Sequence, residues 1–406
     1  MRLTLFAVRN IGRNKRRSAA IVALIALGSA ALLLAGGYAA ANFTGLREVT
    51  IRNGVGHLQI GGRGFGDQED TPLGRGLDDV EGLRRSVLAD PRVRAAAARI
   101  EFTGLASTGD RSVAVLGRGV EPREEYERAG FAPKMVAGRR VMAGVAHEAM
   151  AAAGLARNLN LKPGDRLTLL SATMDGAING LDTVVVGIYT TGVRELDERS
   201  LVVRLDTAQV LLNTTRVSKL VVVLNHTEDT AVARTALLAR LNAEGRAVDV
   251  LTWSDLAAFY HQVRGLFSGI FTFLGAIITV LVVLSAGNAM TMTVMERVQE
   301  IGTLMAVGTS RLRIMGMFVV EGLGLGMIGG ALGLMVGYAL ATGLTRAGIR
   351  MPPPPTFTTG FPLVISVVPV LYAGVLALMI ATLGVAAVLP AARAARLRIT
   401  DALGHV

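Results

Sequence analysis

The residue types that most often carry enzyme chemistry are few and scattered in this 406-residue chain. Cysteine is absent, which excludes disulfides, cysteine-ligated zinc, iron–sulfur clusters and a cysteine nucleophile. None of the four lysines follows Gly or precedes Ser or Thr, so a phosphate-binding Gly-Lys-Ser/Thr loop cannot form. The five histidines are isolated, and His147-Glu148 lacks the second histidine of the zinc-protease pattern. We therefore predict no catalytic residue, no bound cofactor and no metal site in this chain.

Glycines between residues 322 and 337 form the one pattern that suggests a nucleotide. Gly324, Gly326 and Gly329 match Gly-x-Gly-x-x-Gly, but they lie inside an apolar stretch, whereas a dinucleotide fingerprint joins a soluble strand to a helix. Two other sets recur at every fourth position, namely Gly322, Gly326 and Gly330, and Gly329, Gly333 and Gly337. Small residues at this spacing let two helices approach closely in lipid. We therefore predict that these glycines pack helices together.

Long uncharged runs indicate where the chain can cross a bilayer. The chain is 51% hydrophobic and 18% charged, whereas soluble proteins carry about 25% charged residues. A spanning helix needs about 20 mostly apolar residues, and four runs meet this requirement: 19–41, 265–295, 322–345 and 351–392. We predict four transmembrane helices, at 18–43, within a longer segment at 255–295, at 311–346 and at 363–390. The predicted fold class is a four-span membrane protein with a large α+β extracytoplasmic domain, residues 44–254, inserted after the first span.

Charge placement predicts the orientation of these spans. The segment Tyr38-Ala39-Ala40-Ala41 resembles a signal-peptide cleavage site, but a signal's apolar core is about 7–15 residues long and this run is longer, which favours an uncleaved span. Basic residues gather before the first span and after the last. Because Lys and Arg accumulate on the cytoplasmic side, both termini are expected to be cytoplasmic. Residues 44–264 hold 28 basic and 27 acidic residues, so the net charge of +11 does not indicate a nucleic-acid partner.

The inserted domain alternates strand-like and helix-like segments without regular βα repetition, which favours an α+β fold. Predicted strands are rich in Val, Ile, Leu or Thr and cover 56–60, 112–116, 166–170, 183–189, 201–204 and 219–224. Predicted helices cover 80–89, 146–155, 205–212 and 231–243. We expect two lobes, with the second at roughly 138–216.

The second span is expected to be much longer than a bilayer requires. Ser254 is a plausible helix cap, and a helix from there to Met292 would be about 57 Å long at about 1.5 Å per residue. That is roughly twice the thickness of the hydrocarbon core, so we predict a stalk below the soluble domain. Its outer part is aromatic, with Phe259, Tyr260, Phe267 and Phe271. These rings suit either an interfacial belt or contact with an acyl chain or other cargo.

The segment 296–310, between the second and third spans, is short and amphipathic. Val298, Ile301 and Met305 share one helical face, while Glu296 and Glu300 lie together on another. Gly308 can end this helix. Two interpretations remain open on these residues alone: a knob that fits the groove of a soluble partner, or an ordinary polar loop.

Short segments complete the domain assignment: an amphipathic helix at 1–17, an outer loop at 347–362 and a tail at 391–406.

The segment 296–308 reads Glu296-Arg297-x-x-Glu300-Ile301-Gly302-x-x-x-Ala306-x-Gly308 and is followed by Glu321 and the glycine-rich third span. This order of motifs resembles the FtsX-like permeases of ABC transporters, the group that includes the MacB efflux pump and the LolC and LolE lipoprotein-releasing subunits. The chain ends are similar too, with Ala7-x-Arg9-Asn10-x-x-Arg13 and Pro390-Ala391-x-Arg393-Ala394-Ala395-Arg396. Within the insert, Val186-Gly187-Ile188-Tyr189-x-x-Gly192 resembles the second extracytoplasmic subdomain of the family.

The resemblance implies a division of labour between subunits. The segment 296–308 would be the coupling helix that docks on a separate cytoplasmic ATPase dimer, through residues Glu296, Arg297, Glu300, Ile301, Gly302, Met305 and Gly308. ATP and Mg²⁺ would be bound by that ATPase, and the stalk would transmit its movement to the periplasmic domain, a mechanism called mechanotransmission. The family also implies the bacterial inner membrane and a second permease copy, identical or different.

The resemblance leaves three alternatives for the cargo. A lipoprotein-releasing permease fits a chain of this length without an ATPase. LolC carries an extended hairpin that recruits a periplasmic chaperone, and the short, glycine-bearing segment 171–182 leaves a more LolE-like or homodimeric form. A MacB-like efflux permease, which handles amphiphilic cargo and usually carries a fused N-terminal ATPase, is second. The third is an FtsX-like signalling protein that controls a cell-wall hydrolase through an adaptor.

Overall fold

The structure is a computed structural model that describes residues 15–65, 76–145, 147–352 and 360–396. The chain divides into two compact units. A helical unit comprises Met1–Gly45, Gln262–Met351 and Pro362–Val406, and an α+β unit comprises Leu46–His261 and Pro352–Phe361. Most of the amphipathic helix expected at 1–17, and most of the tail expected at 391–406, lie outside the described residues.

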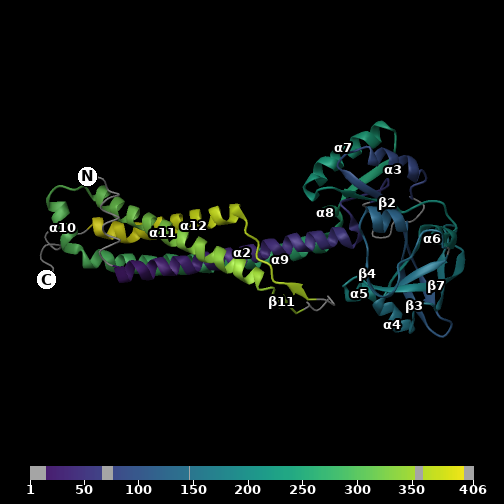
Figure 1. Ribbon diagram of the computed structural model, residues 1–406. Coiled ribbons are helices and arrows are strands. Elements are labelled where there is room, and N and C mark those ends of the chain that lie inside the picture. Colours follow the sequence, from purple (N-terminus) through teal and green to yellow (C-terminus); the bar gives the residue numbers. More distant parts are fainter. Residues whose placement is uncertain (1–14, 66–75, 146, 353–359, 397–406) are drawn as a thin grey trace. The chain divides into compact units, whose positions relative to one another are not determined.

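Four long helices carry the apolar segments, and a fifth, short helix joins two of them (Figure 1). Their bounds are α2 (Lys15–Thr50), α9 (Ala258–Glu296), α10 (Val298–Ala306), α11 (Arg311–Arg346) and α12 (Pro369–Ala395). The segments long and apolar enough to cross a membrane are Ser18–Thr50, Tyr260–Glu296, Arg311–Arg346 and Pro369–Ala395. The predicted four-span class is therefore confirmed. Short strands β11 (Arg350–Met351) and β12 (Phe361–Pro362) lie between α11 and α12.

The α+β unit is built on one ten-stranded mixed sheet. Its strands are β1 (Leu58–Gly62), β2 (Val93–Ser107), β3 (Ser112–Val120), β4 (Lys134–Gly138), β5 (Glu148–Ala152), β6 (Arg166–Ala172), β7 (Ile178–Thr190), β8 (Ser200–Arg204), β9 (Lys219–Leu224) and β10 (Val248–Thr252). The order is β10-β1-β9-β2-β3-β8-β5-β7-β4, and β6 pairs with both β2 and β7. The strands of the expected second lobe therefore join the others through the parallel β3–β8 pair and the antiparallel β2–β6 pair.

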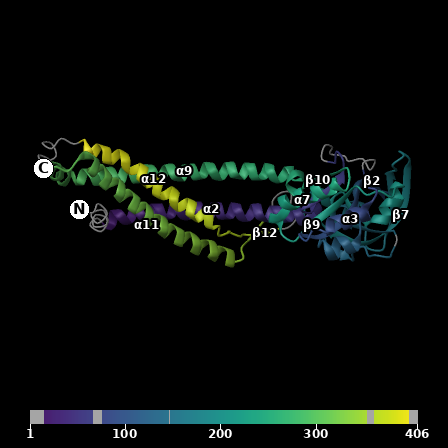
Figure 2. The same cartoon turned by 90° about the horizontal axis from the view of Figure 1, so that it is seen from above.

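Short helices accompany this sheet (Figure 2). They are α3 (Val80–Leu88), α4 (Ala153–Leu159), α5 (Arg194–Asp197), α6 (Leu205–Leu212), α7 (Thr230–Ala243) and α8 (Trp253–Leu256), with single turns η1 (Ile51–Val55), η3 (Arg123–Arg128) and η4 (Thr227–Asp229). The main core includes Leu83 of α3, Leu155 of α4, Leu211 of α6 and Leu237 of α7, together with strand residues such as Ile100. Apolar residues spaced near 3.6 on these helices thus cover the sheet.

The structure corrects two local sequence predictions. Residues 146–155 were expected to be helical, but β5 occupies Glu148–Ala152 and α4 begins only at Ala153. All five β5 residues are buried between β7 and β8, so burial in the sheet overrides the helix propensity of alanine. The prediction that Ser254 caps the helix is also wrong. Thr252 caps α8 in a reciprocal capping box with Asp255, and α9 starts separately at Ala258.

The imidazole of His57 is a pH-sensitive contact in the α+β unit. His57 is only 7% exposed, its Nδ1 accepts from the Leu224 amide at 3.2 Å, and its Nε2 lies 3.1 Å from Thr227 Oγ1. Burial lowers the pKa of His57, and the nearby Arg94 and Arg47 act in the same direction against Glu48 and Glu228. Protonation would also convert the Nδ1 acceptor into a donor facing the Leu224 N–H.

We predict that the α+β unit loses stability as the pH falls from 7 to 5. In the unfolded chain His57 binds a proton near the ordinary histidine pKa of about 6.5, whereas burial disfavours this proton in the folded chain. The free energy of unfolding should therefore fall by at most about 1.4 kcal/mol per pH unit. Fluorescence of Trp253, the only tryptophan, would report melting in the full chain. His57→Gln, which keeps a donor and an acceptor, should flatten this dependence, and an unchanged slope would contradict the assignment. Carboxyl groups with a lowered pKa, such as Glu148, reduce the stability only at a pH below this range.

Candidate functional site

The chain reverses between α9 and α11 through a compact turn–helix–turn (Figure 1). Arg297 leaves helical geometry (φ −116°, ψ 19°), which ends α9 and starts α10. At the other end, Gly308 has φ +94°, its amide donates to the Met305 carbonyl at 3.0 Å, and the Thr309 amide donates to the Leu304 carbonyl at 3.0 Å. This pair of bonds is a Schellman motif, and its left-handed position favours glycine. Gly308 therefore ends the helix as the sequence indicates.

One face of α10 packs on the chain's own spans. Ile301 is 3% exposed and belongs to one apolar cluster with Ile314 and Phe318 of α11 and Ala391 and Ala394 of α12. Val298 and Gly302 are buried too, and Met305 lies at the edge of the cluster. A nine-residue helix is not stable alone, so this packing maintains α10 and determines which face it exposes.

A buried ion pair holds the start of α10. Arg297 Nη1 lies 3.7 Å from Glu321 Oε2, and their side chains are 6% and 10% exposed. Glu321 belongs to α11, immediately before the first packing glycine. Charges that are both removed from water attract strongly, but each is costly once its partner is lost. The pair therefore ties the α9–α10 junction to α11.

The opposite face of α10 is exposed. It carries Gln299, Glu300, Thr303, Ala306 and Val307, and the side chain of Val307 is 83% exposed. Leu312, 76% exposed at the start of α11, adds a second apolar residue. This mixture of a charged group, small polar groups and open apolar side chains is typical of surfaces that bind a protein partner.

The structure thus separates the residues predicted for docking into two groups. Glu296 and Glu300 are exposed, as docking requires. Arg297, Ile301 and Gly302 are buried against the chain's own helices, so they hold the segment in place and are not part of its exposed face. Gln299, Thr303, Val307 and Leu312 belong to the exposed face but were not predicted. Sequence periodicity separates two faces, but it does not say which face the bundle covers.

The glycines of α11 lie on two sides of that helix and meet two different helices. A side-chain carbon built on Gly326 would lie 3.0 Å from Ile380 Cα, and one on Gly322 would lie 2.9 Å from the Leu383 carbonyl oxygen, both on α12. Gly330 also faces α12, whereas Gly329, Gly333 and Gly337 face Ile25, Ser29 and Leu33 of α2. At Gly333 the added carbon would lie 2.4 Å from Ser29 Cβ. Both stripes therefore allow backbone approach that no larger residue permits.

The predicted aromatic cargo contacts do not form one group. Tyr260 is buried, and its ring meets Trp253 edge-on with centroids 5.1 Å apart, so it packs within the chain. Phe267 is exposed and stacks on the half-buried Phe271, with 6.3 Å between the ring centroids. The side chain of Phe259 lies outside the described residues.

Two family comparisons cover most of the chain. Residues 18–240 match the MacB-like periplasmic core domain, and residues 272–399 match the FtsX-like permease C-terminal domain. The lipoprotein-releasing system transmembrane protein LolC of Xylella fastidiosa is 25% identical over 336 residues, 78% of this chain and 79% of LolC.

Two other relatives match over shorter regions. An uncharacterized ABC transporter permease of Methanocaldococcus jannaschii is 29% identical over 160 residues, or 39% of this chain. The macrolide export ATP-binding/permease protein MacB of Hyphomonas neptunium is 30% identical over 125 residues, or 31% of this chain. These matches span only 40% and 19% of the relatives' own lengths.

Four membrane-crossing helices with an α+β domain inserted after the first define a multi-pass membrane protein. The match to the MacB-like core domain covers more than half of the chain, and the permease match covers most of the second span and all of the third and fourth. The chain belongs to the FtsX/MacB-type family of ABC transporter permeases.

We predict that Arg297→Met loosens α10 because it leaves Glu321 buried without its cation, at a cost of about 3–5 kcal/mol. Trypsin cleavage after Arg311 and Arg313, which are exposed just beyond α10, should become faster. Arg297→Met/Glu321→Leu removes both charges and should recover most of the protection. Equal cleavage in the single and double variants would contradict the role of the pair.

We further predict that Gly333→Val destabilises the helical unit, whereas Gly343→Val does not. The first substitution forces α11 away from Ser29, and overpacking of this kind costs about 1–3 kcal/mol. Around Gly343, apart from its own stretch of helix, no heavy atom of the described residues lies within 4 Å of an added carbon, so it is a matched control on the same helix. The loss of monodisperse protein on heating in detergent would measure the difference. Equal melting of the two variants would contradict the packing assignment.

Proposed function

We propose that this chain is a permease subunit that couples to a separate ATPase through the exposed face of α10. The observation that supports this most directly is that α10 is fixed on its inner side and open on its outer side. Ile301 and the Arg297–Glu321 pair hold it to α11 and α12, while Thr303 and Val307 are exposed on its outer side. A push on the outer face would therefore move the spans rather than unfold the helix. ATP and Mg²⁺ would be bound by the ATPase.

Charge at one end of the bundle supports a cytoplasmic position for α10. Helix α11 runs parallel to α2 and antiparallel to α12, as the contacts of Gly329, Gly333 and Gly326 indicate. The start of α2, α10 and the end of α12 therefore share one end. That end carries Arg16, Arg311, Arg313, Arg393 and Arg396. Positive residues near span ends accumulate on the cytoplasmic side, so the proposed orientation places both termini inside and the α+β domain outside.

The length of α9 supports mechanotransmission as the mode of action. Its 39 residues correspond to about 58 Å at about 1.5 Å per residue, well beyond the roughly 30 Å of the hydrocarbon core. The helix begins at Ala258, among residues of the α+β unit, and ends at α10. Movement of α10 would thus be carried along one continuous helix toward the domain.

A second permease copy would complete the transporter. Large apolar side chains on α9 are exposed, namely Leu266, Phe267, Ile270, Phe273, Leu274, Ile277, Leu281 and Leu284. In a membrane this face meets either lipid or another helix. An ABC transporter acts with two permease subunits, and we propose that α9 contributes to their contact.

The proposed cargo is a lipoprotein released from the inner membrane. The long alignment with LolC, which spans most of both chains, supports this choice, and a periplasmic chaperone would then receive the cargo. The MacB-like core domain supports efflux of a small amphiphile as the second candidate. Mass spectrometry of the complex purified in lipid nanodiscs would separate these: triacylated lipoprotein supports release, and a small amphiphile supports efflux. A co-purified hydrolase adaptor without cargo would point to FtsX-like signalling and contradict transport.

We predict that Val307→Asp abolishes co-purification with the ATPase and ATP-driven cargo release without unfolding the permease. A charge at an apolar contact is left without a partner and is costly to desolvate. Val370→Asp is the matched control, because Val370 is 82% exposed but lies at the start of α12, far from Ala391 and Ala394. An acidic residue there is also compatible with a helix N-terminus. Retained binding and release in Val307→Asp would contradict docking on this face.

A further inference from the structure

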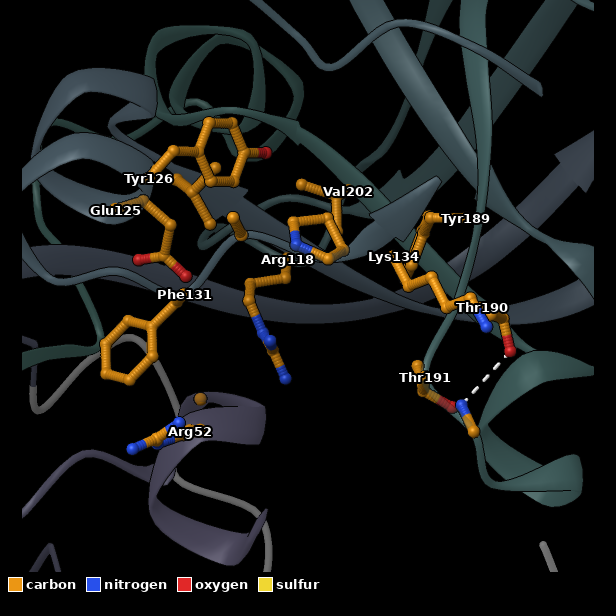
Figure 3. Close-up of a pocket in the computed structure, with 15 residues that line it drawn as sticks. Arg52, Arg118, Glu125, Tyr126, Phe131, Lys134, Tyr189, Thr190, Thr191 and Val202 are labelled. Atoms are coloured by element: carbon orange, nitrogen blue, oxygen red, sulfur yellow. Dashed lines mark hydrogen bonds between the residues drawn. The ribbon is translucent and has the colours of Figure 1, made fainter. Parts of the chain in front are cut away.

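A cleft in the α+β unit is lined by cationic and aromatic side chains that the transport scheme does not use (Figure 3). Its volume is about 370 Å³, within the range of pockets that hold small molecules. Residues of η1, β3, η3, β4, β7 and β8 form its walls. The segment after η3 brings Phe131 and Lys134 to the rim, and β3 contributes Arg118.

Arg118 extends into the middle of this cleft (Figure 3). Among the described residues it has no carboxylate within ion-pair distance, although its cross-strand neighbour is Glu101. The Glu101 carboxylate is engaged by Lys219 at 2.7 Å instead. Gly54 faces the guanidinium closely, since a side-chain carbon there would lie 3.0 Å from Arg118 Nη1. The backbone therefore leaves room for Arg118 but offers no compensating negative charge.

The carboxylates of Glu101 and Glu125, two acidic groups of this region, are already paired with other cations. Glu125 accepts from Arg99 Nε at 3.0 Å and from Arg99 Nη2 at 2.6 Å, and this bidentate pair is buried. Three cations, Arg99, Arg118 and Lys219, thus share two carboxylates. Burial lowers the pKa of Arg99 and of Lys219, and the charge of Arg118 acts in the same direction. Arg118 is the cation in excess.

The rim adds more positive charge and an apolar wall. Lys134 and Arg52 line the cleft and are exposed, and Arg52 Nε lies 3.8 Å from Glu48 Oε2, which offsets part of its charge. Phe131 and Val202 are buried apolar residues on its surface. The hydroxyl of Tyr126, another lining residue, is buried and has no hydrogen-bond partner among the described residues. A buried hydroxyl without a partner is uncommon in a folded protein.

We propose that this cleft binds a small organic anion. A carboxylate or phosphate group would pair with Arg118, with Lys134 and Arg52 adding attraction from the rim. Guanidinium groups recognise such oxyanions through paired hydrogen bonds. The organic part would lie against Phe131 and Val202. A free metabolite and a lipid headgroup could both supply this chemistry. Binding in this cleft involves the α+β unit alone and does not require ATPase docking.

Calorimetric titration of the full chain in a neutral detergent, without ATPase or nucleotide, tests this proposal. Phenyl phosphate serves as a free aryl anion, sn-glycerol 3-phosphate as a lipid headgroup, and inorganic phosphate as the anion alone. We expect saturable binding of at least one organic phosphate that is tighter than that of inorganic phosphate, because the organic part adds apolar contact. Tighter binding of phenyl phosphate assigns the free metabolite, and tighter binding of glycerol phosphate assigns the headgroup.

Variants connect the binding to the cleft. Arg118→Gln should weaken it by about tenfold or more, as expected for a charge-assisted hydrogen bond, and Lys134→Gln, at an exposed position that leaves the core intact, by about threefold. Arg157→Gln removes the same charge from an exposed site on α4 outside the cleft and should leave binding unchanged. Absence of saturable binding for all three probes, or equal weakening by Arg157→Gln and Lys134→Gln, would overturn the proposal.

Discussion

The close approach of α11 to its neighbours is the constraint on which the helical unit depends. Helices in lipid gain little from apolar burial, because the surrounding chains are equally apolar, so they associate through backbone contact and fit. Two glycine stripes make this possible on two sides of one helix. Gly322 and Gly326 admit α12, and Gly329 and Gly333 admit α2. Helix α11 is therefore the member through which α2 and α12 are aligned.

The position of α10 follows from that alignment. The α11–α12 contact brings Ala391 and Ala394 beside Ile314, and together they form the surface on which Ile301 packs. The Arg297–Glu321 pair also restricts the orientation of α10, because it connects the start of this helix to α11. A short helix that is weak by itself becomes a rigid part of the bundle. Its outer face is then presented in one orientation, which is what coupling to a moving partner requires.

In the α+β unit, acidic and basic groups are not evenly matched across the sheet. Most acidic groups near β2 and β3 are used within the fold, as Glu125 is by Arg99 and Glu101 by Lys219. Arg118 remains directed toward a cleft with aromatic walls. A buried ion pair is a costly way to stabilise a fold, so an additional cation whose neighbouring acids are already paired with other cations suggests binding rather than structure.

Hydropathy and short-range spacing were sufficient to predict part of this structure from the sequence. The four spans, the two glycine stripes and the Gly308 stop follow from local composition, because bilayer thickness and helix periodicity act on contiguous residues. Local spacing also indicated the amphipathic character of α10. Strand β2 was missed, because its alanine run is typical of a helix, yet Ala96 and Ala98 are fully buried in the sheet core. Strand β5 was assigned as a helix for the same reason.

Only the tertiary structure decided which face of α10 is covered, which residues hold it and where Arg118 lies. Ile301 and Met305 were recognised as one face, but whether that face meets a partner or the chain's own spans depends on residues about 90 positions later, at Ala391 and Ala394. The pairing of Arg297 with Glu321 and the excess of Arg118 likewise arise from contacts between distant segments. A sequence specifies the period of a helix or strand locally, whereas burial depends on what the rest of the chain brings against it.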